Sequence, residues 1–147
     1  TDECFDYIAR VIKQHPDAQM RSQAARMLPN FSPEQGGDLL LGIIQSEAFE
    51  KASDSEKKAL FASVVMMRAP QTEAFLRDIF EQKSGMFAKK KVDDMKLLVI
   101  GGMEAAPSIP GLQTLAQVAQ DLKRNSKDVC EAARAAAINV KAKLLGS

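Results

Sequence analysis

The sequence predicts an all-α protein made of stacked, antiparallel helix pairs. Apolar residues recur at helical spacing along almost the whole chain, helix-start signals interrupt them at short intervals, and the pattern repeats about every 36 residues. At 147 residues the chain has a common size for one domain. It buries enough surface on folding to need neither metals nor disulfides. We expect a single domain over residues 1–147. Because Thr1 begins in mid-pattern, we interpret the chain as part of a larger protein, with a mature form as the alternative.

Eight helices are expected, and most carry an apolar stripe along one face. In the first helix, the stripe consists of Phe5, Ile8, Val11 and Ile12. The same spacing recurs in the third, fifth and seventh helices, whereas the alternation typical of strands is scarce. Even the strand-like run "KLLVIG" continues into "GMEAA", as a buried helix would. The expected helices are residues 2–14, 17–29, 33–50, 54–68, 71–83, 90–105, 110–122 and 127–144.

Start signals separate these helices. The motif "SPEQ" places Ser32 at a helix cap, Pro33 at the first helical position and Gln35 where a capping box requires it. The motif "SDSE" gives a second capping box, from Ser53 to Glu56. Because the loops are short, successive helices should be antiparallel neighbours. Further helices begin at or near Pro70, Pro110 and Ser126.

The helix pairs repeat along the chain. A shift of 36 residues aligns Leu40 with Leu76 and Leu76 with Leu112. A shift of 108 residues aligns "QAAR" at 23–26 with "EAAR" at 131–134. Each period holds two helices that cannot bury their apolar faces alone, so the pairs must stack. Gly101 and Gly102 cost about 1 kcal/mol each relative to Ala inside a helix, so we expect a neighbouring helix to approach closely there.

One of these second helices also carries the marks of a known repeat. The stretch "HPDAQMRSQAARML" resembles the second helix of a HEAT repeat, with Asp17 in the turn, Arg21 after an apolar residue and a small Ala-rich stretch. The stretch "NSKDVCEAARAAA" is similar, although Cys130 stands where Arg is usual. Two further stretches, "KKVDDMKLLVIGGMEAA" and "EKKALFASVVMMRAP", resemble second helices of bacterial HEAT-repeat proteins. The resemblance implies a right-handed α-solenoid (armadillo-like) of about four stacked antiparallel helix pairs.

Charge and cysteine content limit the classes of partner. The 20 basic and 19 acidic residues give a net charge of +1, so nothing in the overall balance favours nucleic acid or an anionic membrane. The longest apolar run, Leu97 to Met103, is far shorter than the roughly 18 residues of a membrane span. Cys4 and Cys130 form no zinc motif, and we interpret both as free thiols in a reducing compartment, the cytoplasm.

The sequence shows no catalytic constellation, so we expect neither an enzyme nor a cofactor or metal site. The single histidine, His15, precedes Pro16 and is expected to complement the end of the first helix. Asp93 and Asp94 are adjacent, so they face different directions on a helix. They lie in its expected first turn, where acidic side chains interact favourably with the helix dipole. Because the chain has no Trp and only Tyr7 as tyrosine, it has little with which to stack a base.

Basic residues gather near the starts of the expected second helices. Cations there oppose the helix dipole, so local stability does not explain them, and lysines beside helix N-termini form a ready anion site. In a regular stack they would line one side, which we call the basic edge. Acidic residues interleave with them, so an ordinary solvated surface remains the alternative. The basic edge consists of Arg21, Lys57, Lys58, Lys89, Lys90, Lys91 and Lys127.

Methionines suggest a second candidate contact. Met86 lies with Phe87 in the linker between two helices, where we expect Phe87 to be mostly buried and Met86 to be partly exposed. Met86 is therefore a candidate partner contact. The other methionines lie on apolar helix faces and are expected to fill the core. They are Met20, Met27, Met66, Met67, Met95 and Met103.

These features favour a non-enzymatic scaffold that binds another protein or another domain of the same chain, since helical stacks offer long continuous faces. Two alternatives stay open. One is binding of nucleic acid or another polyanion through the basic edge, which the net charge of +1 and the few aromatics disfavour. The other is a repeat-fold enzyme. The sequence names neither the partner nor the oligomeric state.

Overall fold

The structure, a computed structural model, describes residues 2–82 and 89–146, and the side chains of residues 3–82 and 90–146. The chain is 82% helical, and no strand occurs in the part described, which confirms the predicted all-α class. The chain divides into two compact units, Thr1–Glu73 and Ala74–Ser147. Each unit is described by itself below.

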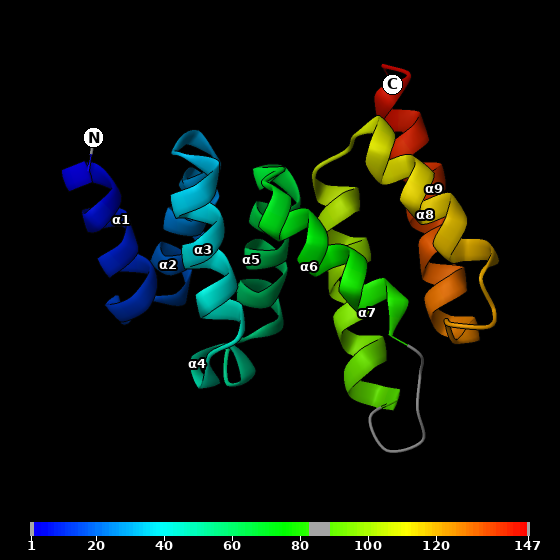
Figure 1. Ribbon diagram of the computed structural model, residues 1–147, viewed down its shortest axis with the longest axis horizontal. Coiled ribbons are helices and arrows are strands. Elements are labelled where there is room, and N and C mark those ends of the chain that lie inside the picture. The colour runs from blue at the N-terminus through cyan, green and yellow to red at the C-terminus, as the bar shows by residue number, and fades with distance from the viewer. Residues whose placement is uncertain (1, 83–88, 147) are drawn as a thin grey trace. The chain divides into compact units, whose positions relative to one another are not determined.

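The first unit consists of antiparallel helices (Figure 1). Helix α2 packs against α1 and α5, and α5 also packs against α3 and the 3-10 turn η1. The second helices of the first two expected pairs, α2 and α5, therefore touch each other directly. The elements are α1 (Asp2–Gln14), α2 (Ala18–Met27), η1 (Leu28–Asn30), α3 (Pro33–Ile44), α4 (Glu47–Glu50), α5 (Asp54–Met67) and the first turn of α6 (Pro70–Glu81).

The second unit also consists of antiparallel helices. After the remainder of α6 come α7 (Lys89–Ala105), α8 (Ile109–Gln120) and α9 (Lys127–Leu144). Helix α9 packs against α7 and α8. Helices α7 and α9 run in the same direction, with α8 opposite to both (Figure 1). Again two expected second helices lie in contact.

The expected helix at 33–50 is wrong in one respect, because the chain breaks it after Ile44. Ser46 donates its hydroxyl hydrogen bond to the Ile43 carbonyl at 2.6 Å and so takes up an acceptor at the end of α3. The break lets the short α4 turn Phe49 inward, where its ring lies 5.9 Å from that of Phe61. Phe49 is only 6% exposed, so burial of an aromatic side chain offsets the interrupted helix.

The capping signals are only partly confirmed. The Ser53 hydroxyl accepts from the Glu56 backbone N–H at 3.2 Å, and Ser126 caps α9 in the same way. Glu56 does not complete its capping box, because its carboxylate bonds to Arg21 instead. Ser32 caps α3 without any side-chain hydrogen bond among the described residues, although Pro33 begins that helix as predicted. The sequence therefore predicted where the helices begin better than it predicted the hydrogen bonds that cap them.

Each unit has a core of aliphatic side chains, but half of the predicted methionine core is wrong. Met67 and Met103 are buried, and Met95 is half-buried. Met20, Met27 and Met66 are 42%, 45% and 52% exposed. They lie off the buried faces of their helices, which are Ser22, Ala24 and Ala25 in α2 and include Phe61 and Val64 in α5. Fully buried side chains include Leu28, Leu40, Phe61 and Val64 in the first unit and Val99, Leu115, Val129 and Val140 in the second.

Close helix approach occurs on α3, at two glycines that the sequence did not single out. A Cβ on Gly101 would meet no atom within 4 Å, so the prediction for that glycine is wrong. A Cβ on Gly36 would lie 2.8 Å from Met67 Cε and 3.2 Å from the Leu28 carbonyl oxygen. At Gly37 it would lie 2.8 Å from Gln71 Nε2. Both glycines are on α3, where they allow η1, α5 and the first turn of α6 to approach.

The two cysteines differ in their exposure to solvent. Cys4 is exposed and Cys130 is buried, and both are free thiols. None of the helices described combines the length and the apolarity needed to cross a bilayer.

Candidate interaction site

The first unit contains a pocket of about 400 Å³ between the end of α1, the starts of α2 and α5, and the α3–α4 corner. Its apolar lining comes from Ile12, Ile43, Phe49 and Leu60. These side chains reach the pocket from separate helices, and the break after α3 is what brings Phe49 to it. Pockets of this size are within the range that holds small ligands or a partner's side chain.

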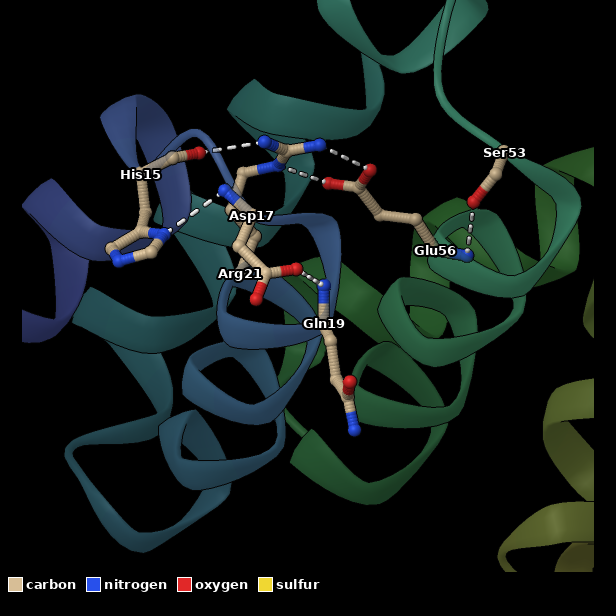
Figure 2. Close-up of polar contacts among 6 residues, drawn as sticks. All are labelled: His15, Asp17, Gln19, Arg21, Ser53 and Glu56. Carbon is tan, nitrogen blue, oxygen red and sulfur yellow. Dashed lines mark hydrogen bonds and ion pairs between the residues drawn. The ribbon is translucent and has the colours of Figure 1, made fainter.

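A part-buried ion pair, Arg21–Glu56, forms the polar wall of this pocket (Figure 2). Arg21 donates from Nε to Glu56 Oε2 at 2.8 Å and from Nη2 to Glu56 Oε1 at 2.9 Å. The side chains are 24% and 11% exposed, so the pair is shielded from water on most sides. The hydrogen bond to Glu56 raises the pKa of the Arg21 guanidinium against the opposing effect of burial. Such a forked pair fixes two helix starts to each other.

Local backbone contacts place Arg21 in this position (Figure 2). The His15 ring accepts at Nδ1 from the Asp17 backbone N–H at 3.0 Å, and Asp17 Oδ1 accepts from the Gln19 N–H at 2.9 Å. Arg21 Nη1 then donates to the His15 carbonyl at 2.6 Å. His15 therefore caps the turn into α2 rather than complementing the end of α1 with its side chain, which corrects the sequence-based expectation. Its role in the structure is to shape the α1–α2 turn.

Three lysines surround the apolar part of the pocket. Lys13 and Lys51 line it, and both are exposed. Lys57 is half-buried, with its ammonium nitrogen 5.4 Å from the centroid of the Phe49 ring, within reach of a cation–π interaction. Among the residues that the structure describes, neither Lys13 nor Lys51 forms an ion pair with a carboxylate. Their charges face a pocket whose only acidic lining residue is already bonded to Arg21.

The members of the predicted basic edge have different environments. Arg21 does not belong to an exposed edge, because Glu56 neutralises it. Lys57 packs over Phe49, and Lys58 is exposed. The ion pair between Arg21 and Glu56 was not predicted from the sequence. The two residues are 35 positions apart, and no periodic pattern indicates a contact at that separation.

In the second unit, the lysines at the helix starts are exposed. Lys90 and Lys91 open α7, and Lys127 opens α9 at the same end of the unit (Figure 1). Lys127 Nζ lies 4.0 Å from Glu131 Oε1, a surface pair one turn apart. The side chain of Lys89, together with Met86 and Phe87, lies outside the described residues. The basic edge as a continuous surface, and the contact at Met86, stay predictions.

Sequence reasoning missed a buried lysine in the second unit. Lys96 is 0% exposed and donates to the carbonyls of Gln82 and Arg124, the latter at 2.8 Å, and to Asn125 Oδ1 at 2.8 Å. Burial lowers the pKa of its ammonium group. A signal was present, because Lys96 lies three and four residues before the buried Val99 and Ile100, on the apolar face of α7. Its aliphatic stem covers the core while its ammonium group satisfies carbonyls where α6 ends and α9 begins.

The adjacent acids Asp93 and Asp94 differ in exposure. Asp93 is half-buried and Asp94 is exposed, one turn into α7. No group of three or more metal-ligating side chains gathers anywhere in the described parts of the chain. The pocket of the first unit is therefore the site with the most definite geometry.

Comparison with known proteins identifies no relative of the chain. No family model matches it, and neither a curated protein nor a solved structure matches it. The resemblance to HEAT repeats remains a sequence-based prediction. The pocket and its charges are therefore the features that bear on function.

Proposed function

We propose that this chain is a non-enzymatic helical-repeat module that binds another protein, and that the pocket of the first unit is its contact site. The observation that carries the proposal is the combination of an apolar interior with two lysines, Lys13 and Lys51, that pair with no carboxylate in the described chain. Apolar side chains with a charged rim are the usual anatomy of a protein interface. The polar groups deeper in the pocket, Arg21 and Glu56, are bonded to each other, which suits a structural wall.

The helix contacts support the repeat architecture within this proposal. In each unit the second helices of successive pairs touch, α2 with α5 and α7 with α9. The same contacts would follow from a right-handed, HEAT-like solenoid of about four pairs. The two free cysteines support a reducing compartment such as the cytoplasm.

Binding of nucleic acid is the weaker candidate. A polyanion would be bound by cations spaced along a surface to meet successive phosphates. The ion pair with Glu56 removes Arg21 from that set, and Lys57 packs over Phe49. An apolar pocket between lysines suits a protein segment better, because a phosphate backbone has nothing to fill it.

The test is selection of binders from a random peptide library displayed on phage, with the purified chain as target. The bound surface is then located by hydrogen exchange. We expect enriched peptides to protect residues 12–21 and 43–60, the segments that form the pocket. An unfolded sample of the chain controls for unspecific adhesion to apolar segments. Failure to enrich any peptide above that control, or protection confined to the second unit, would contradict the proposal.

A further inference from the structure

We infer that the pocket of the first unit recognises an acidic segment of a partner protein, one that inserts a large apolar side chain between carboxylates. This inference rests on the proposed function and adds the chemistry of the partner. It follows from three features of the pocket: its apolar interior, its excess of positive charge and the donors that remain on Arg21.

The interior fits an apolar side chain. Ile12, Ile43 and Leu60 supply aliphatic surface, and the Phe49 ring supplies an aromatic one. A volume of about 400 Å³ is near the lower end of the range for ligand sites, which suits one or two side chains better than an extended cofactor. A leucine or phenylalanine of the partner would fill this space and remove apolar surface from water.

The lining carries excess positive charge. Arg21 and Glu56 neutralise each other, which leaves Lys13 and Lys51 as the charges of the lining without a counterion in the described residues. The acidic residues of the neighbouring turns, Glu47, Glu50 and Asp54, do not line the pocket. Carboxylates on the ligand would therefore complete the charge balance and steer its approach.

Arg21 adds a directional donor. A guanidinium group has five N–H donors, and Arg21 uses three of them on Glu56 and the His15 carbonyl. Two remain without an acceptor among the described residues, on a side chain that lines the pocket. A carboxylate of the ligand would be within reach of a fixed donor here and of flexible ammonium groups at Lys13 and Lys51. These two lysines come from different elements, so carboxylates on both sides of the apolar residue fit better than the single one of a fatty acid.

The experiment measures fluorescence polarisation with short synthetic peptides. The probe has a central leucine or phenylalanine with two acidic residues on each side. One matched peptide keeps the acidic residues around a central alanine, and another keeps the leucine between serines. We expect the probe to bind at least about tenfold more tightly than either, a difference of about 1.4 kcal/mol. Raising the salt concentration should weaken binding of the probe and leave binding of the serine peptide nearly unchanged.

Charge reversal identifies the pocket. The double variant K13E/K51E should lose at least about tenfold in affinity for the probe. The matched control is R10E/R77E, which reverses two exposed arginines, one in α1 and one in α6, that lie outside the lining and outside the predicted basic edge. It should keep wild-type affinity within about threefold, and all three proteins should melt together because exposed charges matter little to stability.

Several results would overturn the inference. Equal binding of the acidic and serine peptides, or an equal loss of affinity for R10E/R77E and K13E/K51E, would contradict recognition of an acidic segment. Tighter binding of a single-stranded oligonucleotide or a long-chain fatty acid, lost in the same double variant, would assign the pocket to another ligand. If displayed peptides protect the pocket without needing acids, this inference fails while the proposed function stands.

Discussion

The packing of the first unit predicts opposite outcomes for one substitution made twice in one helix. Gly36 and Gly42 both lie in α3, but a Cβ on Gly36 meets Met67 and the Leu28 carbonyl, whereas one on Gly42 meets no atom within 4 Å. Gly42→Ala should therefore stabilise the first unit and Gly36→Ala should destabilise it. The backbone of Leu28 cannot yield as a side chain would, because it belongs to the 3-10 turn η1.

The magnitudes follow from two effects. Alanine in place of glycine in a helix gains about 0.5–1 kcal/mol from backbone entropy, and both variants share this gain. Gly36→Ala also inserts a methyl group into a contact of 2.8 Å with Met67 Cε and 3.2 Å with the Leu28 oxygen. Overpacking of this kind costs about 1–3 kcal/mol. Gly42→Ala should thus gain about 0.5–1 kcal/mol, and the two variants should differ in free energy of unfolding by about 1–3 kcal/mol.

Urea unfolding followed by far-ultraviolet circular dichroism measures both variants, with an unchanged m-value as evidence that the unfolded state is the same. A double-mutant cycle with Met67→Ala apportions the clash. If Met67 carries most of it, Gly36→Ala should cost less in that background; if the Leu28 carbonyl does, the cost should persist. Equal stability of Gly36→Ala and Gly42→Ala would refute the close approach of α3 to η1 and α5.

Three further predictions concern single polar groups. Glu56→Gln should lower the free energy of unfolding by about 2 kcal/mol because charged hydrogen bonds to Arg21 are lost, and a double replacement of both residues by methionine should cost less than the single change. Burial lowers the pKa of Lys96, so the unfolded chain holds this proton to higher pH than the folded protein. Wild-type stability relative to Lys96→Met should therefore rise with pH between that lowered pKa and the ordinary value of 10.5, measured by urea unfolding across the window. A thiol reagent should label the exposed Cys4 quickly in the folded protein. It should label Cys130 only on unfolding, because that thiol is buried and burial raises its pKa. Fast labelling of both cysteines would contradict the burial of Cys130.

The all-α class and the bounds of most helices were predictable because helical periodicity and helix-start signals act locally. The ends of most helices lie within two residues of the predicted ones, since apolar stripes and Pro or Ser starts mark them. The exception is the helix expected at 33–50. Its break after Ile44 lets Phe49 turn inward to meet Phe61, a residue of another helix. A contact between residues in different helices leaves no periodic trace, so the break after Ile44 was not predictable from spacing.

The candidate site was much less predictable, for the same physical reason. Lys57 was singled out for its position near a helix start, and it does border the pocket through Phe49. Lys13 and Lys51 were not singled out, because an isolated lysine near a helix end has no distinguishing pattern. Only the packing of α1, α4 and α5 around one space gives these two residues a common environment.

Arg21 and Lys96 bond to the chain in similar ways in their two units. Each cation lies in the second helix of a pair and bonds to a carbonyl at or just after the end of the preceding helix, His15 for Arg21 and Gln82 for Lys96. Carbonyls at a helix end have no partner in their own helix, and buried ones are costly to leave unpaired. Each cation then extends to a further element, Arg21 to Glu56 at the start of α5 and Lys96 to the residues before α9. A basic residue of a second helix can therefore link that helix to the element that follows, and among the predicted basic edge this is the structural role of Arg21. Lys13 and Lys51 have no such partner in the described residues, so binding of a ligand would explain them.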